Sequence, residues 1–365
     1  MKYFILLLVA FVSFSIAGCG LNNDNFISPN DLHFQYEGRI DKSTPNSFLF
    51  SQPGTSIKFR FEGKKCTLKL KNESDKNLSN YYNLIIDNKE PKTIAISNSD
   101  SNYPIELQDG KPHTVTIFKR TENLVGVGIF EGIVLEEDKK LLPLESKKHK
   151  MEFIGNSITC GYGNEGSSKE CPFSPETENN YLAYSATTAR NLNAEFYAIA
   201  YSGIGMIQNF DLANKQTMPL VYSRILADFP DSKWNFENYT PDVVVLNLGT
   251  NDFAHSNPDS TFFSTTYLAF VRNIRKNYPK TQIFCIEGCM LNDDSPNNRK
   301  AKTTLKKHIE VIVAKLHSEG DKSIYSFFFN GMKNDELGCD WHPNVKKHQI
   351  MATDLTEFIK SKTGW

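Results

Sequence analysis

The pattern of hydrophobic and polar positions changes near residue 145. Before it, from residue 32, short runs such as TLKLKN and HTVTIFKRT alternate apolar with polar residues and are rich in β-branched and aromatic side chains. Turn signals such as PG, EG, DN and DG separate these runs. Alternation with a period of two predicts strands that bury one face. We therefore expect residues 32–145 to form an all-β sandwich, jelly-roll-like in topology.

After residue 145, strand-like runs alternate with helical stretches. The predicted strands are residues 151–155, 195–200, 242–248, 281–287 and 324–329. The predicted helices are residues 181–193, 217–229, 260–277, 299–318 and 344–361. Strands that alternate with helices predict a parallel sheet covered by helices on both faces. Residues 146–365 are thus expected to form an α/β/α doubly wound, flavodoxin-like domain with a five-stranded parallel sheet.

Residues 1–18 are typical of a signal peptide. Lys2 gives a short positive start, an apolar run spans residues 4–16, and small residues follow. The sequence IAGC at the end resembles a bacterial lipoprotein box, which predicts lipidation of Cys19 and a polar tether over residues 19–31. An ordinary secretory signal, with Cys19 as a plain thiol, is the alternative. The expected location is the bacterial cell envelope, with the lipid anchor as the contact with the membrane.

Composition and motifs argue against several classes of function. Lysine plus arginine is 41 and aspartate plus glutamate is 42, so the basic excess of proteins that bind nucleic acid through phosphates is missing. Nucleotide-binding glycine motifs and zinc-type cysteine spacings are also missing, so we expect neither a cofactor nor a metal. Cys160 and Cys171 flank a glycine-rich loop and could close it as a disulfide. Two buried thiols are the alternative.

Candidate chemistry lies directly after the predicted parallel strands. GNSIT, YSGIG and GTND follow the first three strands, and CDWHPN follows the last strand after a loop. In such sheets, ligands bind at the carboxyl ends of the strands. Ser157, in a tight strand-to-helix turn, directs its N–H toward a developing oxyanion, and Gly203 and Asn251 can supply further donors. His342 is expected within reach of Ser157 as a general base.

Each of these residues also has a structural explanation. A serine at a strand end is commonly a helix N-cap, GTND is commonly a turn, and a histidine near a helix start is commonly a surface or capping residue. The four residues occur in this order and at one edge of the predicted sheet. Their joint occurrence favours acyl-transfer chemistry over the separate explanations.

Together these motifs resemble a known group of hydrolases. GNSIT, the glycine of YSG, GTND and WHP are similar to the four sequence blocks of the SGNH (GDSL-type) hydrolase superfamily. GNSITCGYG, CDWHPN and the preceding β sandwich resemble carbohydrate esterase family 2, whose members are exported deacetylases that remove O-acetyl groups from plant polysaccharides.

The resemblance implies a role for each matching residue. Ser157 would be the nucleophile and His342 the base. The N–H groups of Ser157 and Gly203 and the side-chain amide of Asn251 would form the oxyanion hole. Trp341 would be a stacking platform for a sugar ring.

One position departs from the superfamily pattern. Most members have an aspartate three residues before the histidine, whereas this chain has Cys339 there and Asp340 one residue later. We therefore expect a Ser–His dyad in which a backbone carbonyl or another polar group orients the imidazole. A role for Asp340 through a different loop conformation is the alternative. The loops 163–171 and 291–298 are expected to shape specificity.

The sequence thus favours a cell-envelope serine esterase that removes O-acetyl groups from acetylated xylan or glucomannan through an acyl-enzyme intermediate. A lipase-like or generic ester hydrolase is one alternative, and a non-catalytic glycan-binding lipoprotein is another. The joint retention of the four candidate residues argues against the last.

Overall fold

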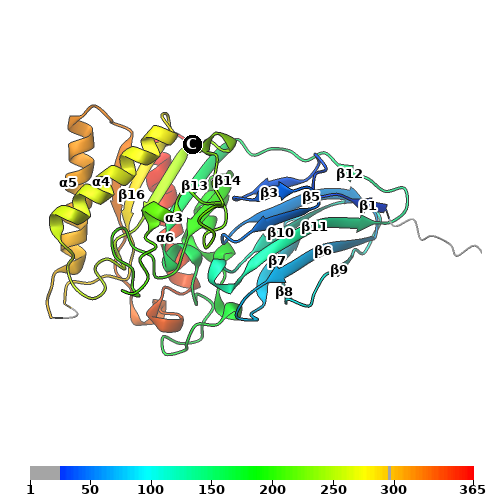
Figure 1. Ribbon diagram of the computed structural model, residues 1–365, viewed down its shortest axis with the longest axis horizontal. Helices are drawn as coiled ribbons and strands as arrows, with labels where there is room; N and C mark the ends of the chain where they lie inside the picture. The colour runs from blue at the N-terminus through cyan, green and yellow to red at the C-terminus, as the bar shows by residue number, and fades with distance from the viewer. Residues whose placement is uncertain (1–24, 295–296) are drawn as a thin grey trace, which may run out of the picture.

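Two domains lie side by side in the computed structural model, which describes residues 25–294 and 297–365. Figure 1 shows the N-terminal β domain, in blue to cyan, next to the α/β domain, whose edge strand β14 (Ala194–Ala200) is nearest to it. The predicted signal peptide and the lipidation site Cys19 lie outside the described residues. Within the described part, no helix has both the length and the apolar character needed to cross a bilayer.

The N-terminal domain is an antiparallel β sandwich, as predicted. One sheet has the order β3-β4-β11-β6-β9 with β1 paired to β11, and the other has the order β12-β5-β10-β7-β8 with β2 paired to β5. The strands are β1 (Asn25–Ile27), β2 (Gln35–Glu37), β3 (Asp41–Thr44), β4 (Ser47–Phe50), β5 (Ser56–Glu62), β6 (Lys65–Glu73), β7 (Asn80–Ile86), β8 (Lys92–Ile96), β9 (Tyr103–Glu106), β10 (Pro112–Lys119), β11 (Val127–Leu135) and β12 (Leu141–Leu142).

The sandwich core follows from the alternation in the sequence. Leu68 and Leu70 on β6 and Phe59 and Phe61 on β5 are fully buried, and all four belong to one hydrophobic cluster between the two sheets. The intervening residues of β6 are only partly buried. Aromatic and β-branched side chains at every second position therefore fill the space between the sheets.

The domain begins earlier than the sequence predicts. Residues 25–27, placed in the tether, form β1 and pair antiparallel with β11. Gly132 permits this pairing, since a Cβ atom there would lie 2.3 Å from the carbonyl oxygen of Ile27. A three-residue strand held mainly by backbone contacts has too little side-chain pattern to be recognised in the sequence.

The C-terminal domain is the predicted doubly wound sheet. Its five strands are all parallel in the order β14-β13-β15-β16-β17. The remaining strands and the helices are β13 (His149–Gly155), β15 (Val243–Asn247), β16 (Gln282–Glu287), β17 (Ile324–Phe328), α1 (Ser157–Cys160), α2 (Tyr184–Asn191), α3 (Met218–Val221), α4 (Ser260–Asn277), α5 (Ala301–Ser318) and α6 (Val345–Thr363).

Helices cover both faces of this sheet. Val244 and Leu246 of β15 belong to a cluster with buried residues of α4 and α5, whereas Val243 and Val245 pack with buried residues of α2 and α6. Strand β14 lies on one side of β13, and β15, β16 and β17 follow on the other side. The strand order therefore changes direction beside β13. The carboxyl end of β13 is therefore where a ligand site is expected.

One predicted helix is wrong. The prediction of a helix over residues 217–229 holds only for α3, and irregular turns follow it. The buried guanidinium of Arg39, from the β domain, donates to the carbonyl oxygens of Tyr222 and Arg224, the latter at 2.9 Å. These carbonyls are paired across the domain interface instead of within a helix, so a tertiary contact overrides the local pattern.

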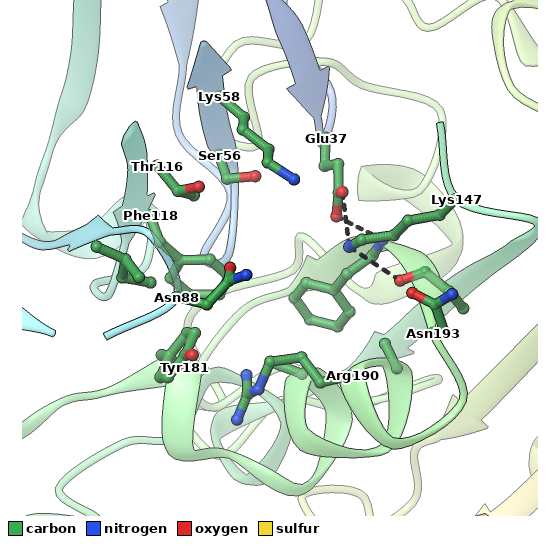
Figure 2. Close-up of a pocket in the computed structure, with 15 residues that line it drawn as sticks. Glu37, Ser56, Lys58, Asn88, Thr116, Phe118, Lys147, Tyr181, Arg190 and Asn193 are labelled. Atoms are coloured by element: carbon green, nitrogen blue, oxygen red, sulfur yellow. Dashed lines mark hydrogen bonds and ion pairs between the residues drawn. The ribbon is translucent and has the colours of Figure 1, made fainter. Parts of the chain in front are cut away.

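The two domains are also joined at the start of β14. Glu37 pairs with Lys147 at 2.7 Å and its carboxylate accepts the N–H of Phe196 at 2.9 Å. Lys147 in turn donates to the carbonyl of Ala194 at 3.1 Å. Figure 2 shows Glu37 and Lys147 beside a cavity between the domains. This cavity has a volume of about 190 Å³, and Ala194 and Phe196 also line it. This cavity lies at the amino end of β14, at the opposite end of the strand from the candidate catalytic residues.

Candidate active site

Ser157 and His342 lie within hydrogen-bond distance of each other. Ser157 is the first residue of α1, directly after β13, and the Asn156 side chain caps this short helix by accepting the N–H of Ile158 at 3.1 Å. The Nε2 atom of His342 is 2.8 Å from Ser157 Oγ. The structure thus brings together the two residues predicted as nucleophile and base, although they are 185 positions apart in the sequence.

A backbone carbonyl orients the His342 ring. The Nδ1 atom is 2.9 Å from the carbonyl oxygen of Asp340, which can only accept, so Nδ1 carries the proton and Nε2 is free to accept one from Ser157. The Asp340 carboxylate faces away from the ring, since one oxygen accepts the Tyr162 hydroxyl at 2.8 Å and the Phe173 N–H at 3.1 Å. This is the geometry that the predicted dyad requires.

His342 is neutral near pH 7. Burial lowers its pKa to about 4, and the hydrogen bond to the Asp340 carbonyl opposes this shift only in part. The ring of Tyr162 covers one side of the imidazole, with 4.3 Å between ring centroids. A neutral imidazole with a free Nε2 lone pair is the form that a general base needs.

The turn before His342 has an unusual backbone. Asp340 and Trp341 have φ values of +49° and +57°, a conformation that is costly for a tryptophan. Main-chain hydrogen bonds hold this turn. The N–H of Asp340 donates to the carbonyl oxygen of Cys171 at 2.9 Å, and the N–H of Trp341 donates to the carbonyl oxygen of Lys169 at 3.2 Å. The loop that contains residues 169–171 thus supports the position of the histidine.

The suggested disulfide between Cys160 and Cys171 is not formed. Cys171 instead forms a disulfide with Cys339, 168 positions away. This bond links the loop that contains residues 169–171 covalently to the turn before His342. Cys160 is a buried free thiol. Its side chain lies in the core after β13, whereas Cys171 lies in the surface loop. The spacing of the two cysteines in the sequence does not show this difference, because it depends on the tertiary fold.

The three predicted oxyanion donors line the same cavity as Ser157 and His342. Among the described residues, the N–H groups of Ser157 and Gly203 have no acceptor. Gly203 has a φ of +77°, a conformation available to glycine at little cost, although a Cβ atom would meet only Phe210, at 3.8 Å. The Asn251 amide donates one hydrogen to the Ile204 carbonyl at 2.7 Å and has a second one to offer.

The cavity has a volume of about 660 Å³, within the usual range for small-molecule sites. Trp341, with 54% of its surface exposed, and the exposed Phe210 both line it. Leu291, from the loop predicted to shape specificity, also lines it, whereas the described lining includes no residue of loop 163–171. Ser202, Thr250, Ala254 and Met290 complete the wall together with Tyr162 and Asp340.

Comparisons with known proteins identify the family of this chain. Residues 36–144 match the carbohydrate esterase 2 N-terminal family, and residues 153–350 match the GDSL-like lipase/acylhydrolase family. A solved structure of a family two carbohydrate esterase from Clostridium thermocellum, in complex with cellohexaose, is 36% identical with a TM-score of 0.82, covering 91% of this chain and 99% of that one. The chain belongs to carbohydrate esterase family 2. It is therefore a carboxylic ester hydrolase.

Two curated relatives are similar to this chain over most of its length. The cellulase/esterase CelE of Acetivibrio thermocellus is 37% identical over 335 residues, 90% of this chain, and the chain spans 39% of that protein's length. An acetylxylan esterase/glucomannan deacetylase of Cellvibrio japonicus is 30% identical over 333 residues, which are 88% of this chain and 87% of the relative.

The sequence motifs did not indicate the residues that support this family 2 site. Asp252, the last residue of GTND, is buried and accepts the N–H groups of Met206, Ile207 and Gln208 at 2.8, 2.7 and 3.1 Å. These bonds fix the loop that begins at Gly203. Burial raises the pKa of Asp252 to about 6. The signal in the sequence that could have indicated this role is the position of Asp252, an acidic residue directly after the predicted oxyanion donor Asn251.

Among the described residues, one group has the arrangement of potential metal ligands. Atoms of Glu122, Cys160 and Glu178 lie within 4.8 Å of one another, and all three residues are buried. The Lys119 ammonium adjoins them and donates to the Glu122 carbonyl at 3.1 Å. Burial raises the pKa of the Cys160 thiol well above its usual value, so it stays protonated. The group fits a buried carboxyl pair beside a lysine better than a metal site.

Proposed function

We propose that this family 2 esterase removes O-acetyl groups from plant cell-wall polysaccharides, acetylated xylan or glucomannan, through an acyl-enzyme intermediate formed by a Ser157–His342 dyad. The observation that carries the proposal is the 2.8 Å contact between His342 Nε2 and Ser157 Oγ, in a cavity that Gly203 and Asn251 also line. The relatives named as acetylxylan esterases and glucomannan deacetylases support the substrate class.

Acylation begins when Ser157 Oγ attacks the acetyl carbonyl carbon and its proton moves to His342 Nε2. The carbonyl oxygen becomes an oxyanion, which accepts hydrogen bonds from the Ser157 and Gly203 N–H groups and from Asn251. The C–O bond to the sugar then breaks, and His342 returns the proton to the sugar oxygen. This releases the polysaccharide with a free hydroxyl and leaves acetyl-Ser157.

Deacylation repeats these steps with water. His342 Nε2 takes a proton from water as its oxygen attacks the acetyl carbon, and the same donors stabilise the second oxyanion. Acetic acid leaves when the bond to Ser157 Oγ breaks and His342 returns the proton to that oxygen, and it then ionises to acetate in solution. Trp341, at the exposed side of the cavity, is suited to stack against the sugar ring that bears the ester.

Acetate release measures this activity directly. Wild type, Ser157→Ala and the exposed-serine control Ser318→Ala would be assayed on acetylated xylan, acetylated glucomannan, p-nitrophenyl acetate and a longer acyl ester. We expect release from polysaccharide that falls by about 10³-fold or more in Ser157→Ala and is unchanged in Ser318→Ala. Activity confined to the long-chain ester would favour the lipase-like alternative. Release that does not depend on Ser157 would contradict the serine mechanism.

The location is a separate part of the proposal. The lipoprotein box at Cys19 supports attachment to the bacterial cell envelope through a lipid, with the two domains outside the bilayer. Metabolic labelling with a radioactive fatty acid would show label in the wild type and none in Cys19→Ala. Label that persists in Cys19→Ala would refute anchoring at this residue.

A further inference from the structure

Part of the β domain reaches the active-site edge of the α/β sheet. This segment follows β10, and its residue Glu122 is fully buried. One Glu122 carboxylate oxygen accepts the N–H of Ser202 at 2.8 Å. Ser202 immediately precedes Gly203, so the Glu122 contact fixes the peptide next to the one whose N–H faces the oxyanion.

Glu122 is itself held by a buried network. Its N–H donates to a Glu178 carboxyl oxygen at 3.0 Å, and the two carboxyl groups share a side-chain hydrogen bond. Burial raises the pKa of both carboxyl groups, and that of Glu178 well above its usual value, so Glu178 is the member of the pair that holds a proton. The Lys119 side chain lies beside this pair and donates to the Glu122 carbonyl at 3.1 Å, and burial lowers its pKa to about 7. The network leaves Glu122 little freedom to move.

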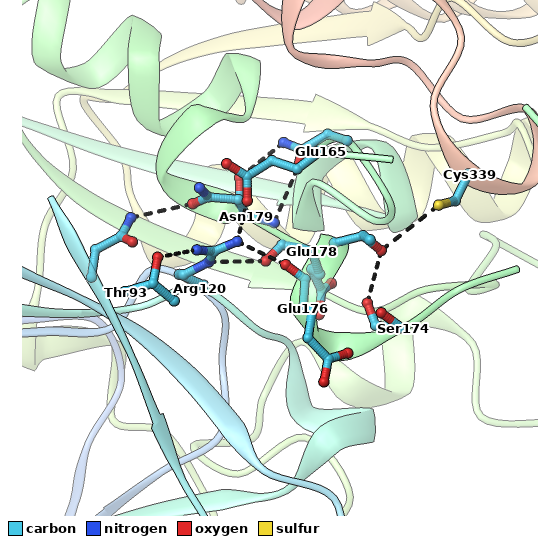
Figure 3. Close-up of polar contacts among 11 residues, drawn as sticks. Thr93, Arg120, Glu165, Ser174, Glu176, Glu178, Asn179 and Cys339 are labelled. Carbon is cyan, nitrogen blue, oxygen red and sulfur yellow. Dashed lines mark hydrogen bonds and ion pairs between the residues drawn. The ribbon is translucent and has the colours of Figure 1, made fainter. Parts of the chain in front are cut away.

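Arg120, in the same segment, holds the loop beside the histidine turn. Figure 3 shows its guanidinium among groups of that loop: it pairs with the Glu165 carboxylate and donates to the carbonyl oxygens of Glu176 and Glu178 at 3.0 and 3.3 Å. Between these positions the loop contains Cys171, which is bonded to Cys339. Arg120 is thus connected to the turn before His342 through this loop, because Arg120 contacts the loop at Glu165, Glu176 and Glu178 and the disulfide joins the loop to Cys339.

We propose that Arg120 and Glu122 are positioning residues through which the β domain completes the esterase site. Glu122 sets the oxyanion loop at Gly203, and Arg120 sets the loop that supports His342. The inference rests on the proposed roles of Gly203 and His342. It assigns the β domain a part in catalysis that is distinct from carbohydrate binding.

The chain contains a matched control for Glu122. Glu37 is another β-domain glutamate that accepts a backbone N–H of the α/β domain, that of Phe196, at the amino end of β14. Glu122 accepts the corresponding kind of bond just beyond the carboxyl end of the same strand. A general loss of interface stability affects both variants, whereas a loss of oxyanion geometry affects Glu122 alone.

The test compares Glu122→Gln with Glu37→Gln in kcat and KM for p-nitrophenyl acetate and in thermal unfolding. We expect kcat to fall by about 10- to 100-fold in Glu122→Gln with KM within about twofold, because a displaced oxyanion donor weakens mainly the transition state. Glu37→Gln is expected to retain kcat within about twofold. Equal kcat values in the two folded variants would overturn the proposal for Glu122.

Arg120→Lys provides a second variant, because it keeps the charge and loses the multiple donors. A kcat about tenfold lower with an unchanged KM is expected, and full kcat in the folded variant would overturn the proposal for Arg120. Ser157→Ala, assayed in parallel, separates the two levels of the argument. If it is as active as wild type, the proposed function fails; if it is inactive while the Glu122 and Arg120 variants are fully active, only the positioning inference fails.

Discussion

Substitutions at Asp340 test the dyad most directly, because the backbone carbonyl and the side-chain carboxylate of this residue have different partners. The Asp340 carbonyl accepts the His342 Nδ1 hydrogen bond, whereas one carboxylate oxygen accepts the Tyr162 hydroxyl and the Phe173 N–H. Asp340→Asn replaces the other oxygen by NH₂, keeps an acceptor for both contacts and removes only the charge. It leaves the carbonyl that orients the ring in place.

The expected magnitude follows from these contacts. In a triad, loss of the carboxylate that orients the histidine costs about 10⁴-fold in kcat. Because the Asp340 carboxylate does not contact the ring, we expect Asp340→Asn to lower kcat by less than about tenfold. Its charge raises the pKa of His342 slightly, so the substitution shifts the acidic limb of the rate profile to lower pH.

Asp340→Ala is the contrasting variant. It loses two hydrogen bonds of about 1 kcal/mol each and places alanine at a φ of +49°, where aspartate and asparagine are better tolerated, so the free energy of unfolding is expected to fall by about 2–4 kcal/mol. Steady-state kinetics on p-nitrophenyl acetate and urea unfolding would be measured for wild type, both variants and His342→Ala. A loss of kcat in Asp340→Asn that approaches that of His342→Ala would refute the dyad.

Four further predictions concern Trp341, Asp252 and the protonation of His342. Trp341→Ala is expected to raise KM for acetylated polysaccharide by about 3- to 10-fold and to leave p-nitrophenyl acetate unaffected, and equal changes on both substrates would contradict a stacking role. Asp252→Ala removes the acceptor of three N–H groups, of which that of Met206 is buried, so the free energy of unfolding should fall by about 1–3 kcal/mol and kcat should fall with it, as measured by denaturation and initial rates. Because the His342 pKa is lowered to about 4 in the fold, kcat/KM should stay insensitive to His342 protonation down to about pH 5 and be lost below pH 4. The unfolded state binds this proton near the usual pKa of 6.5 and the folded state only near 4, so the contribution of His342 to the free energy of unfolding should decrease from pH 6.5 toward pH 4. Urea series of wild type and His342→Ala measure this contribution as the difference between the two proteins, and a wild-type advantage that grows over this interval would contradict the assignment.

The parallel sheet explains why so much of the candidate site can be predicted from sequence. Ser157 and Gly203 each follow a strand that hydrophobic patterning identifies to within two residues, and the carboxyl ends of parallel strands meet at one edge. Asn251 follows β15 in the same way. Local patterns therefore place residues from distant parts of the chain in one cavity without any knowledge of side-chain contacts.

Features that depend on packing between segments could not be predicted in this way. The Cys171–Cys339 disulfide joins two loops whose proximity follows from the course of the chain over the sheet edge. The predicted helix after residue 221 is replaced by turns because Arg39, from the other domain, pairs with its carbonyl groups. Glu122 belongs to a segment that reads as an ordinary turn between strands. In each case the deciding partner is remote in sequence and has no recognisable motif.

A dyad makes the surrounding supports more important than they are in a triad. A carbonyl dipole stabilises the imidazolium formed during the reaction less than a carboxylate does, so the proposed mechanism depends more on the exact placement of His342 and on the oxyanion donors. The turn at Asp340 and Trp341 adopts a costly conformation, which persists only where neighbouring contacts hold it. Those contacts come from a loop tied to Cys339 and to Arg120. If the dyad is correct, substitutions at Arg120 should therefore be more damaging here than equivalent substitutions in a relative that has a carboxylate beside its histidine.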